Sequence, residues 1–399
     1  MAISLATGGF CFAFLLALTL NWFALRPWRI SVGKHWMERA RLLHPARISA
    51  RINSWLIPAT VGMFCYSLCP DQDFLLAAIP GFVGTVSANY IMGREVVPDL
   101  GFKAWLHLLA ASLFLFFLWW AVLIFTIINM PLDFGFLTWL VAGGVLILLL
   151  SFNFGLGILL LRWFRLVQPA TEHLKDMVNE VSQKMGVPVR ASWILSTYIS
   201  NALAFPLTRQ LVFTDKLLTT LTEDEIKAVC AHELGHLNEP RKVLFVRLLV
   251  AMAFYPLIFA RPMSSLGNMG TSAFWLLLIG VLIVWLAGIR VSRRMETRAD
   301  KIAVENQVDA AVYARALERI YQTNQMPAVM PKRSSKIHPD LYDRMIAAGV
   351  TPDYPKPAPA KGQCWTSRAM LFAVMLSPVV ALVVKLAMDI LDAAIINIK

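Results

Sequence analysis

Charged residues are scarce in this sequence, and their scarcity excludes an ordinary soluble protein. Only 16% of the 399 residues are Asp, Glu, Lys or Arg, 58% are hydrophobic, and the mean hydropathy is +0.61. Soluble globular proteins are typically about a quarter charged. The composition therefore predicts an integral membrane protein with one or more parts that face water.

Cysteine is also sparse, and its distribution excludes a disulfide framework. The five cysteines are scattered and odd in number: Cys11, Cys65, Cys69, Cys230 and Cys364. We interpret all of them as small apolar side chains without a cysteine metal site. Basic nucleic-acid motifs with interleaved aromatics are absent as well, so we expect no nucleic-acid partner. The net charge of +12 instead indicates cytoplasmic loops of a multi-span protein.

Long apolar runs divide the chain into membrane and water-facing parts. Eight runs are candidate spans: 8–25, 55–69, 74–92, 105–128, 136–161, 243–260, 273–289 and 369–384. A bilayer core of about 30 Å requires about 20 apolar residues, and the fourth and fifth runs meet this best. We expect a predominantly α-helical protein with about seven to eight spans, because the last run could span the bilayer or lie along its interface.

Basic residues set the expected orientation of these spans. The segment 26–51 is rich in Arg and Lys, with Glu38 as a lone acid, and is predicted to be a loop. The positive-inside rule places this loop in the cytoplasm and the N-terminus outside. We therefore expect a bacterial inner-membrane protein with its chemistry on the cytoplasmic side. An endoplasmic reticulum membrane is the alternative.

One stretch outside the apolar runs carries a metal-binding pattern. His232, Glu233 and His236 form the sequence H-E-x-x-H, and Thr222 with Glu225 predicts a capped helix start before it. We expect this helix to continue past residue 240 into the sixth apolar run. It places both imidazoles on one face, where they can hold one zinc ion. Glu233 could then take a proton from the attacking water. The alternative is an amphipathic helix whose histidines stack by chance.

A zinc ion held by two histidines needs a third protein ligand. Glu296 and Asp300 lie four residues apart on a predicted helix that follows the seventh apolar run. We expect Glu296 to be the third ligand and Asp300 to hydrogen-bond a ligand histidine. A solvated pair of acids within a basic helix is the alternative.

Other water-facing segments predict the surroundings of this site. β-favouring runs at 194–198 and 211–214 predict a small sheet beside the metal helix, and an edge strand there could pair with a substrate backbone. An ordinary hairpin is equally compatible with these residues. His338 and Arg344 could approach a developing oxyanion, although the residues alone favour a helix entry with a surface His and Arg.

Taken together, these motifs resemble the membrane zinc metallopeptidase family that includes the CAAX prenyl protease type 1 enzymes and the HtpX heat-shock protease. The resemblance rests on residues 200–202, 211–218, 225–236, 296–300, 338–339 and 344. It implies a small α+β domain of the gluzincin type, with His232, His236 and Glu296 as zinc ligands and Glu233 as general base.

The resemblance also implies roles for residues around the metal. It implies that Asn201 and Ala202 lie on a strand that lines the substrate groove, and that His338 and Arg344 act as transition-state or structural helpers. It favours Asp300 as a hydrogen-bond partner of a ligand histidine.

The motifs and runs predict the domain order and the function. We expect a membrane domain at 1–161, metallopeptidase segments at 162–242 and 291–350 around two spans at 243–290, a Pro-rich linker at 351–368 and an apolar helix at 369–399. The expected function is zinc-dependent endopeptidase cleavage of peptides or membrane proteins, in quality control or peptide processing. A membrane scaffold or chaperone of the same fold, or a transporter with a fortuitous motif, are the rivals.

Overall fold

The described chain falls into two compact units. The computed structural model describes residues 2–68, 75–307, 309–331 and 339–376, with 379, 383 and 386. The first unit comprises Met1–Phe102, Gln325–Ser334 and Lys356–Lys399, and the second comprises Lys103–Asn324 and Ser335–Pro355. His338 and most of the predicted C-terminal helix lie outside the described residues. The predicted domain boundaries stay a prediction.

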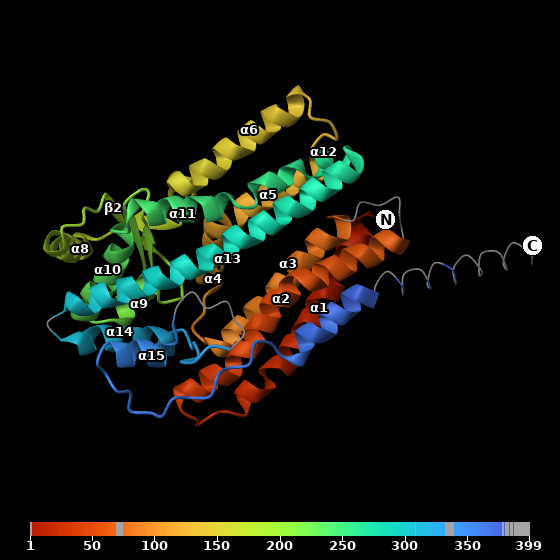
Figure 1. Ribbon diagram of the computed structural model, residues 1–399. Coiled ribbons are helices and arrows are strands. Elements are labelled where there is room, and N and C mark those ends of the chain that lie inside the picture. The colour runs from red at the N-terminus through yellow and green to blue at the C-terminus, as the bar shows by residue number, and fades with distance from the viewer. Residues whose placement is uncertain are drawn as a thin grey trace, which may run out of the picture. The chain divides into compact units, whose positions relative to one another are not determined.

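The first unit is built on three long helices that pack closely. They are α1 (Ala2–Arg29), α2 (Trp36–Leu68) and α3 (Leu75–Val96) (Figure 1). Small side chains such as Ala13 and Ala88 are fully buried between them. A Cβ on Gly84 would lie 2.5 Å from the carbonyl oxygen of Phe10, so glycine is needed where α1 and α3 approach each other.

The basic segment that the sequence predicts as a cytoplasmic loop is largely helical. Helix α1 extends to Arg29 and α2 begins at Trp36, so only a short turn separates them. The prediction of a loop over 26–51 is therefore wrong. Leu43 and Ala46 are fully buried in the same cluster as Leu25, because apolar residues on one side of α2 pack onto α1.

Six helical segments among the described residues are long and apolar enough to cross a membrane. They are Ile3–Arg29, Leu75–Val96, Phe102–Asn129, Phe136–Trp163, Arg241–Ser264 and Met269–Glu305. The chain is thus a predominantly α-helical multi-span membrane protein, as predicted. The predicted second run is helical within α2 but is not one of the six, and the described part of the eighth run is the short apolar helix Trp365–Leu376.

Three of the four described spans of the second unit are interrupted helices. The first joins α4 (Phe102–Ser112), a π-helical turn η1 (Leu113–Phe117) and α5 (Leu118–Asn129); the second joins α6 (Phe136–Ser151), a π-helical turn η2 (Phe152–Leu156) and α7 (Gly157–Trp163). The third joins α11 (Arg241–Met252), a 3₁₀ turn η3 (Tyr255–Phe259) and α12 (Ala260–Ser264), and the fourth is α13 (Gly267–Glu305).

A small mixed sheet and its helices form the water-facing part of this unit. The strands are β1 (Val167–Pro169), β2 (Ala191–Leu195), β3 (Ala202–Phe205) and β4 (Gln210–Thr214), in the order β1-β2-β4-β3. Strands β2 and β4 are parallel, and the outer strands pair antiparallel to them. The helices are α8 (Glu172–Met185), α9 (Asp215–Thr220), α10 (Glu223–Leu237), α14 (Ala310–Thr323) and α15 (Leu341–Ala347).

Helix α13 connects the membrane part of this unit to its water-facing part. It has 39 residues, which at 1.5 Å per residue gives a length of about 58 Å. Because a bilayer core is about 30 Å thick, one helix can both cross it and extend well beyond it. Figure 1 shows α13 running from α12, past α11, to α10. Its last third therefore carries Glu296 to the helix that bears the two histidines.

Candidate metal centre

Helix α10 begins as the sequence predicts. Thr222 and Glu225 form a capping box, in which the Thr222 backbone N–H donates to Glu225 Oε2 at 2.9 Å. Glu225 is buried and also accepts a hydrogen bond from Arg319 of α14 at 3.0 Å. The cap therefore fixes the start of the helix and ties it to a neighbouring helix, which sets the direction in which the histidines project.

The end of α10 differs from the prediction. The helix stops at Leu237, and α11 starts at Arg241. Pro240 between them has φ −57° and ψ 144°, which is extended backbone. A helix that runs on through residue 240 is therefore wrong, because proline interrupts the hydrogen-bond ladder of a helix interior. The break lets the span depart in a new direction directly after the second histidine.

Gly235, between the two histidines, lets α13 come close to α10. A Cβ at this position would lie 3.2 Å from the Cα and 3.3 Å from the Cβ of Ala299. Ala299 is itself nearly fully buried, and the Arg298 guanidinium donates to the Gly235 carbonyl at 3.4 Å. This close contact brings Glu296, one turn before Ala299, next to both histidines.

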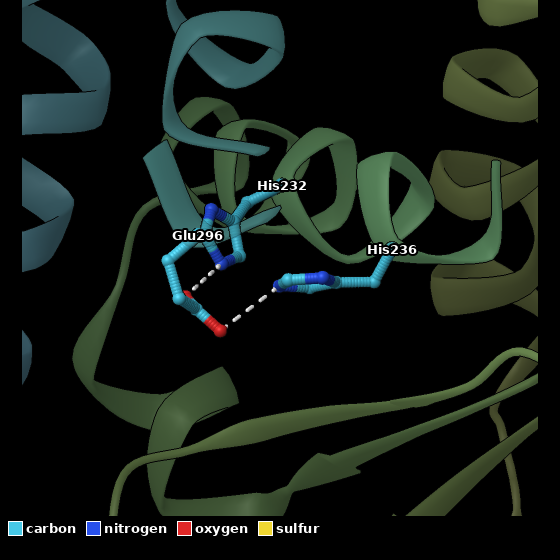
Figure 2. Close-up of side chains that lie close together, drawn as sticks. All are labelled: His232, His236 and Glu296. Atoms are coloured by element: carbon cyan, nitrogen blue, oxygen red, sulfur yellow. Dashed lines mark ion pairs between the residues drawn. The ribbon is translucent and has the colours of Figure 1, made fainter. Parts of the chain in front are cut away.

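The three predicted ligands converge on one point. Glu296 Oε2 lies 3.7 Å from His232 Nε2, and Glu296 Oε1 lies 3.5 Å from His236 Nε2 (Figure 2). Two atoms bound to one tetrahedral zinc at about 2.1 Å would be about 3.4 Å apart. All three residues are buried, and their ligand atoms lie within 4.8 Å of one another. The spacing and the donor set therefore fit a single zinc ion.

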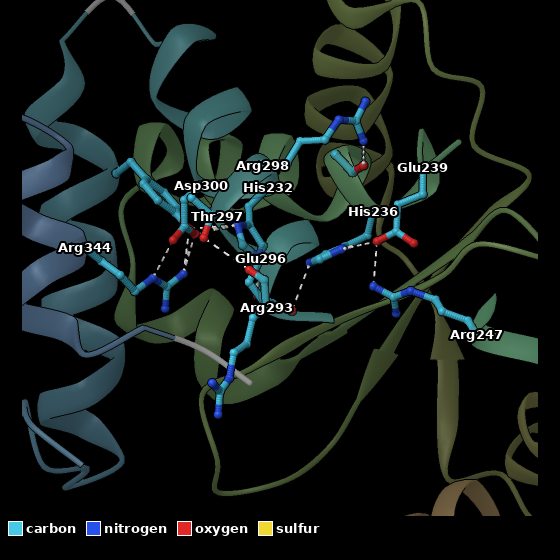
Figure 3. Close-up of polar contacts among 12 residues, drawn as sticks. His232, His236, Glu239, Arg247, Arg293, Glu296, Thr297, Arg298, Asp300 and Arg344 are labelled. Carbon is cyan, nitrogen blue, oxygen red and sulfur yellow. Dashed lines mark hydrogen bonds and ion pairs between the residues drawn. The ribbon is translucent and has the colours of Figure 1, made fainter. Parts of the chain in front are cut away.

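The imidazole of His236 is oriented from behind by a carboxylate. Its Nδ1 donates to Glu239 Oε1 at 2.9 Å, and the same oxygen accepts from Arg247 of α11 at 2.6 Å (Figure 3). Burial lowers the pKa of His236, but the carboxylates of Glu239 and Glu296 outweigh it and raise that pKa to about 10 in the metal-free site. With Nδ1 donating to Glu239, Nε2 is the atom that faces Glu296.

A second network orients His232. The Tyr313 hydroxyl lies 2.8 Å from His232 Nδ1 and donates to Asp300 Oδ1 at 2.7 Å. Because its proton points to Asp300, the hydroxyl oxygen accepts the Nδ1 proton of His232. Asp300 Oδ1 itself lies 3.1 Å from that nitrogen. Both histidines therefore have Nδ1 engaged, which leaves the Nε2 atoms for a metal.

Arg344 completes this second network. Its guanidinium donates to Asp300 Oδ2 at 2.9 Å and to Asp300 Oδ1 at 2.7 Å (Figure 3). It also donates to the Tyr313 hydroxyl at 2.9 Å. Arg344 is only 8% exposed, so its interpretation as a surface residue is wrong. Burial lowers its pKa, but the neighbouring Tyr313 and Asp300 hold it well above the usual value, so the arginine stays charged. Its predicted approach to an oxyanion stays a prediction.

The remaining predicted site residues occupy different positions. Glu233 is buried on α10 between the two histidines. Asn201 precedes β3 and Ala202 begins it, and β3 lies at the end of the strand order, next to α10. Of the two predicted substrate residues, Ala202 thus lies on an edge strand beside the metal helix and Asn201 directly before it, while their contact with substrate stays a prediction. His338 lies outside the described residues.

Two residues that contact the histidines are missing from the predictions. Glu239 follows His236 by three residues, a spacing that puts both on one side of a helical turn and could have indicated contact. Tyr313 is fully buried and 81 residues from His232. Tyr313 lies on α14, far from the motif in sequence, so no local signal linked it to the metal centre.

Comparison with known proteins finds relatives of the region that carries this centre. Residues 169–349 match Peptidase family M48. The chain is 27% identical over 199 residues to "Protease HtpX" of Hahella chejuensis, which covers 45% of this chain and 62% of that protein. It is 24% identical over 201 residues to a "Protease HtpX homolog" of a Sulfurihydrogenibium species, covering 45% and 66% respectively. A "Protease HtpX homolog" of Thermococcus sibiricus is 29% identical over 182 residues, covering 41% and 62%.

These matches cover part of this chain and part of each relative. Residues 169–349 are similar to Peptidase family M48, and the chain is similar to proteases named HtpX. The matched region spans about two thirds or less of each of these relatives, at 62%, 66% and 62% of their lengths. It includes α10, the end of α13 and α15, which carry the three proposed ligands and Arg344.

Proposed function

We propose that this chain is an integral membrane zinc metalloendopeptidase. His232, His236 and Glu296 hold one zinc ion, and Glu233 is the general base. The observation that carries the proposal is the donor set itself. The Nε2 atoms of His232 and His236 lie 3.7 and 3.5 Å from the Glu296 carboxylate oxygens, and both Nδ1 atoms are engaged by other residues.

The bound zinc would supply a Lewis acid that polarises the scissile carbonyl and acidifies the attacking water. The protein residues provide the rest of the chemistry. Glu233 accepts a proton from the attacking water and passes it to the departing amine. Glu239 holds His236 in place, and Tyr313 with Asp300 holds His232, so neither imidazole needs to reorient during turnover.

The edge of β3 is the proposed binding place for substrate backbone. β3 pairs with β4 on one side and ends the strand order in the described part of the chain. An extended peptide can add to such an edge through main-chain hydrogen bonds. Asn201 and Ala202 would lie along this peptide. Pairing through the backbone places few demands on side chains, which suits an enzyme that cleaves varied peptides or membrane proteins.

The proposed substrates and location follow from the membrane helices. Since Glu296 lies at the end of a span, a substrate can approach from the bilayer or from the water on the same side. We propose a bacterial inner membrane with the metal centre on the cytoplasmic side, and a role in membrane-protein quality control or peptide processing. A scaffold of the same fold is the second candidate, and it needs no general base.

The test is the substitution Glu233→Gln. It keeps the size of the side chain and all three proposed metal ligands, but it removes the proton acceptor. We expect zinc content near that of the unaltered protein and a loss of peptide cleavage of at least about a hundredfold. Cleavage is followed by mass spectrometry of an unfolded membrane-protein substrate, and zinc by inductively coupled plasma mass spectrometry.

The matched control is Glu223→Gln. Glu223 belongs to the same helix, but its side chain is 65% exposed in the first turn. The Glu223→Gln protein should cleave peptide at the same rate as the unaltered protein. Full cleavage by the Glu233→Gln protein would remove Glu233 from the mechanism, and no cleavage by the unaltered protein with zinc bound would favour the scaffold.

A further inference from the structure

A cavity lies on the face of the sheet opposite the metal helix. On β2, Ile194 packs into the core that contains Ala231 and Leu234 of α10, whereas Trp193 points the other way, toward Leu161 of α7. On this second side a cavity of about 530 Å³ opens. Its lining combines the break in the α6–α7 span with the starts of β2 and β4: Ser151, Phe154, Gly155, Leu156, Ile158, Leu159, Arg162, Arg190, Ala191, Trp193, Thr208 and Gln210.

The chemistry of this lining is divided between two walls. The span contributes an apolar wall, which includes Phe154, Leu156 and Leu159. Arg162 and Arg190 supply two positive charges, and none of the described lining residues is acidic. A cavity that joins an apolar wall to uncompensated positive charge fits a ligand with an apolar part and an anionic group.

The two arginines are available to a ligand. Both are exposed, and neither has an ion-pair partner among the residues that the structure describes. The Arg162 guanidinium lies 4.7 Å from the centre of the Trp193 ring, and Trp193 Nε1 donates to Gln210 Oε1 at 2.8 Å. This stacking holds Arg162 over the cavity without neutralising its charge.

The cavity lies at the end of a membrane span. Arg162 is in the last turn of α7, and the following residues Trp163 and Phe164 are 78% and 57% exposed. Exposed aromatic residues at the end of a span are typical of the membrane–water interface. The apolar wall therefore lies at the level of the lipid acyl chains, and the arginines lie at the level of the lipid headgroups.

A break in the span forms part of the cavity wall. Phe154 and Gly155 leave helical geometry, and Gly155 has φ +101°, which favours glycine. A Cβ there would lie 3.0 Å from Thr208 Cγ2 of the β3–β4 turn. Non-helical backbone at membrane depth is tolerated where it lines a cavity or is covered by protein. The break thus lies where the cavity and the β3–β4 turn cover the non-helical backbone.

We propose that this cavity binds a phospholipid with a net negative headgroup. Arg162 and Arg190 contact the phosphate, and the start of an acyl chain lies along Phe154 and Leu159. Basic pockets beside membrane helices recognise anionic headgroups through such charge pairing. The site is separate from the metal centre, because the sheet lies between them, and it does not depend on the proposed peptidase activity.

The test measures lipid retention by the full-length protein in detergent, using native mass spectrometry. Phosphatidylglycerol and phosphatidylcholine with identical acyl chains are compared for the unaltered protein and for the double variant Arg162→Gln/Arg190→Gln. The matched control is Arg26→Gln, which removes an exposed arginine in the last turn of α1. A further variant, Ala191→Trp, fills the cavity and keeps both arginines.

The unaltered protein and Arg26→Gln should bind phosphatidylglycerol roughly tenfold or more tightly than phosphatidylcholine. The double variant should lose this preference, and Ala191→Trp should lose phosphatidylglycerol itself. Equal retention of phosphatidylglycerol by the double variant would overturn the proposal. So would displacement of the lipid by an equal concentration of inorganic phosphate, which would identify a site for free anions, or retention of an acidic peptide in place of lipid.

Discussion

At the scale of single residues, the metal centre depends on groups that never touch the metal. Each proposed histidine ligand has its Nδ1 in contact with a polar group on another element or turn: Glu239 for His236, and Tyr313 with Asp300 for His232. Such contacts fix the tautomer and the ring orientation of a ligand. The affinity for zinc should therefore be sensitive to substitutions of the residues that contact the ligand histidines without touching the metal.

Glu239→Gln tests this dependence on the His236 side. Glutamine keeps the shape of the side chain, but it removes the negative charge that His236 and Arg247 share. Zinc affinity should fall about tenfold to a hundredfold, measured by competition with a coloured chelator. Glu305→Gln, at an exposed position on α13, is the control. An affinity equal to that of this control would show that Glu239 does not position the ligand.

Proton release tests the state of His236 in the metal-free site. Its pKa is raised to about 10 there, so at neutral pH the ring is protonated and Nε2 carries a proton that zinc must displace. Below this pKa, zinc affinity should rise about tenfold per pH unit as the pH increases. Chelator competition at pH 6.5, 7.5 and 8.5 measures the slope. A flat profile would mean that His236 is already neutral before zinc binds.

At the scale of elements, the site exists because two helices approach closely. Gly235 faces Ala299 where α10 crosses α13, and this contact sets the position of Glu296. Helix α10 is itself fixed at its start by the capping box and by Arg319 of α14. The geometry of the three proposed ligands is therefore a property of helix packing as much as of the motif.

Gly235→Ala tests the helix contact. A methyl group at this position would lie 3.2 Å from a backbone atom of Ala299, so α13 would have to shift. We expect a loss of about 1–3 kcal/mol in stability, typical of overpacking, together with weaker zinc binding. Thermal unfolding and chelator competition measure the two effects. The control is Gly280→Ala on α13, because a Cβ at Gly280 would meet no atom within 4 Å. Identical behaviour of the two variants would contradict the packing argument.

Sequence reasoning succeeded at this scale where the signal is local. The spacing of His232 and His236 and the capping residues of α10 are periodic patterns within one helix, and the structure contains both. The break at Pro240 was missed although the polar residues around it and the proline itself are a local signal for a helix end. Tyr313 was missed because its contact with His232 depends on how α14 packs, which no local pattern encodes.

At the scale of the whole molecule, the chain joins a region similar to Peptidase family M48 to several membrane helices. The family match covers residues 169–349, whereas α1, α2 and α3 of the first unit lie outside it. Apolar run length predicted most of the spans, because hydropathy acts over a single helix. The parallel pairing of β2 with β4 and the partition into two units depend on long-range contacts, and sequence patterns did not indicate them.

The most direct test of the account is removal and return of the metal. The full-length protein is stripped with a chelator, and peptide cleavage and zinc content are measured on the same samples as zinc is added back. Cleavage should disappear with the zinc and return in proportion to it, reaching a maximum at one zinc ion per chain. Cleavage that persists in zinc-free protein, or that does not return when His232, His236 and Glu296 have bound zinc, would contradict the proposed metallopeptidase.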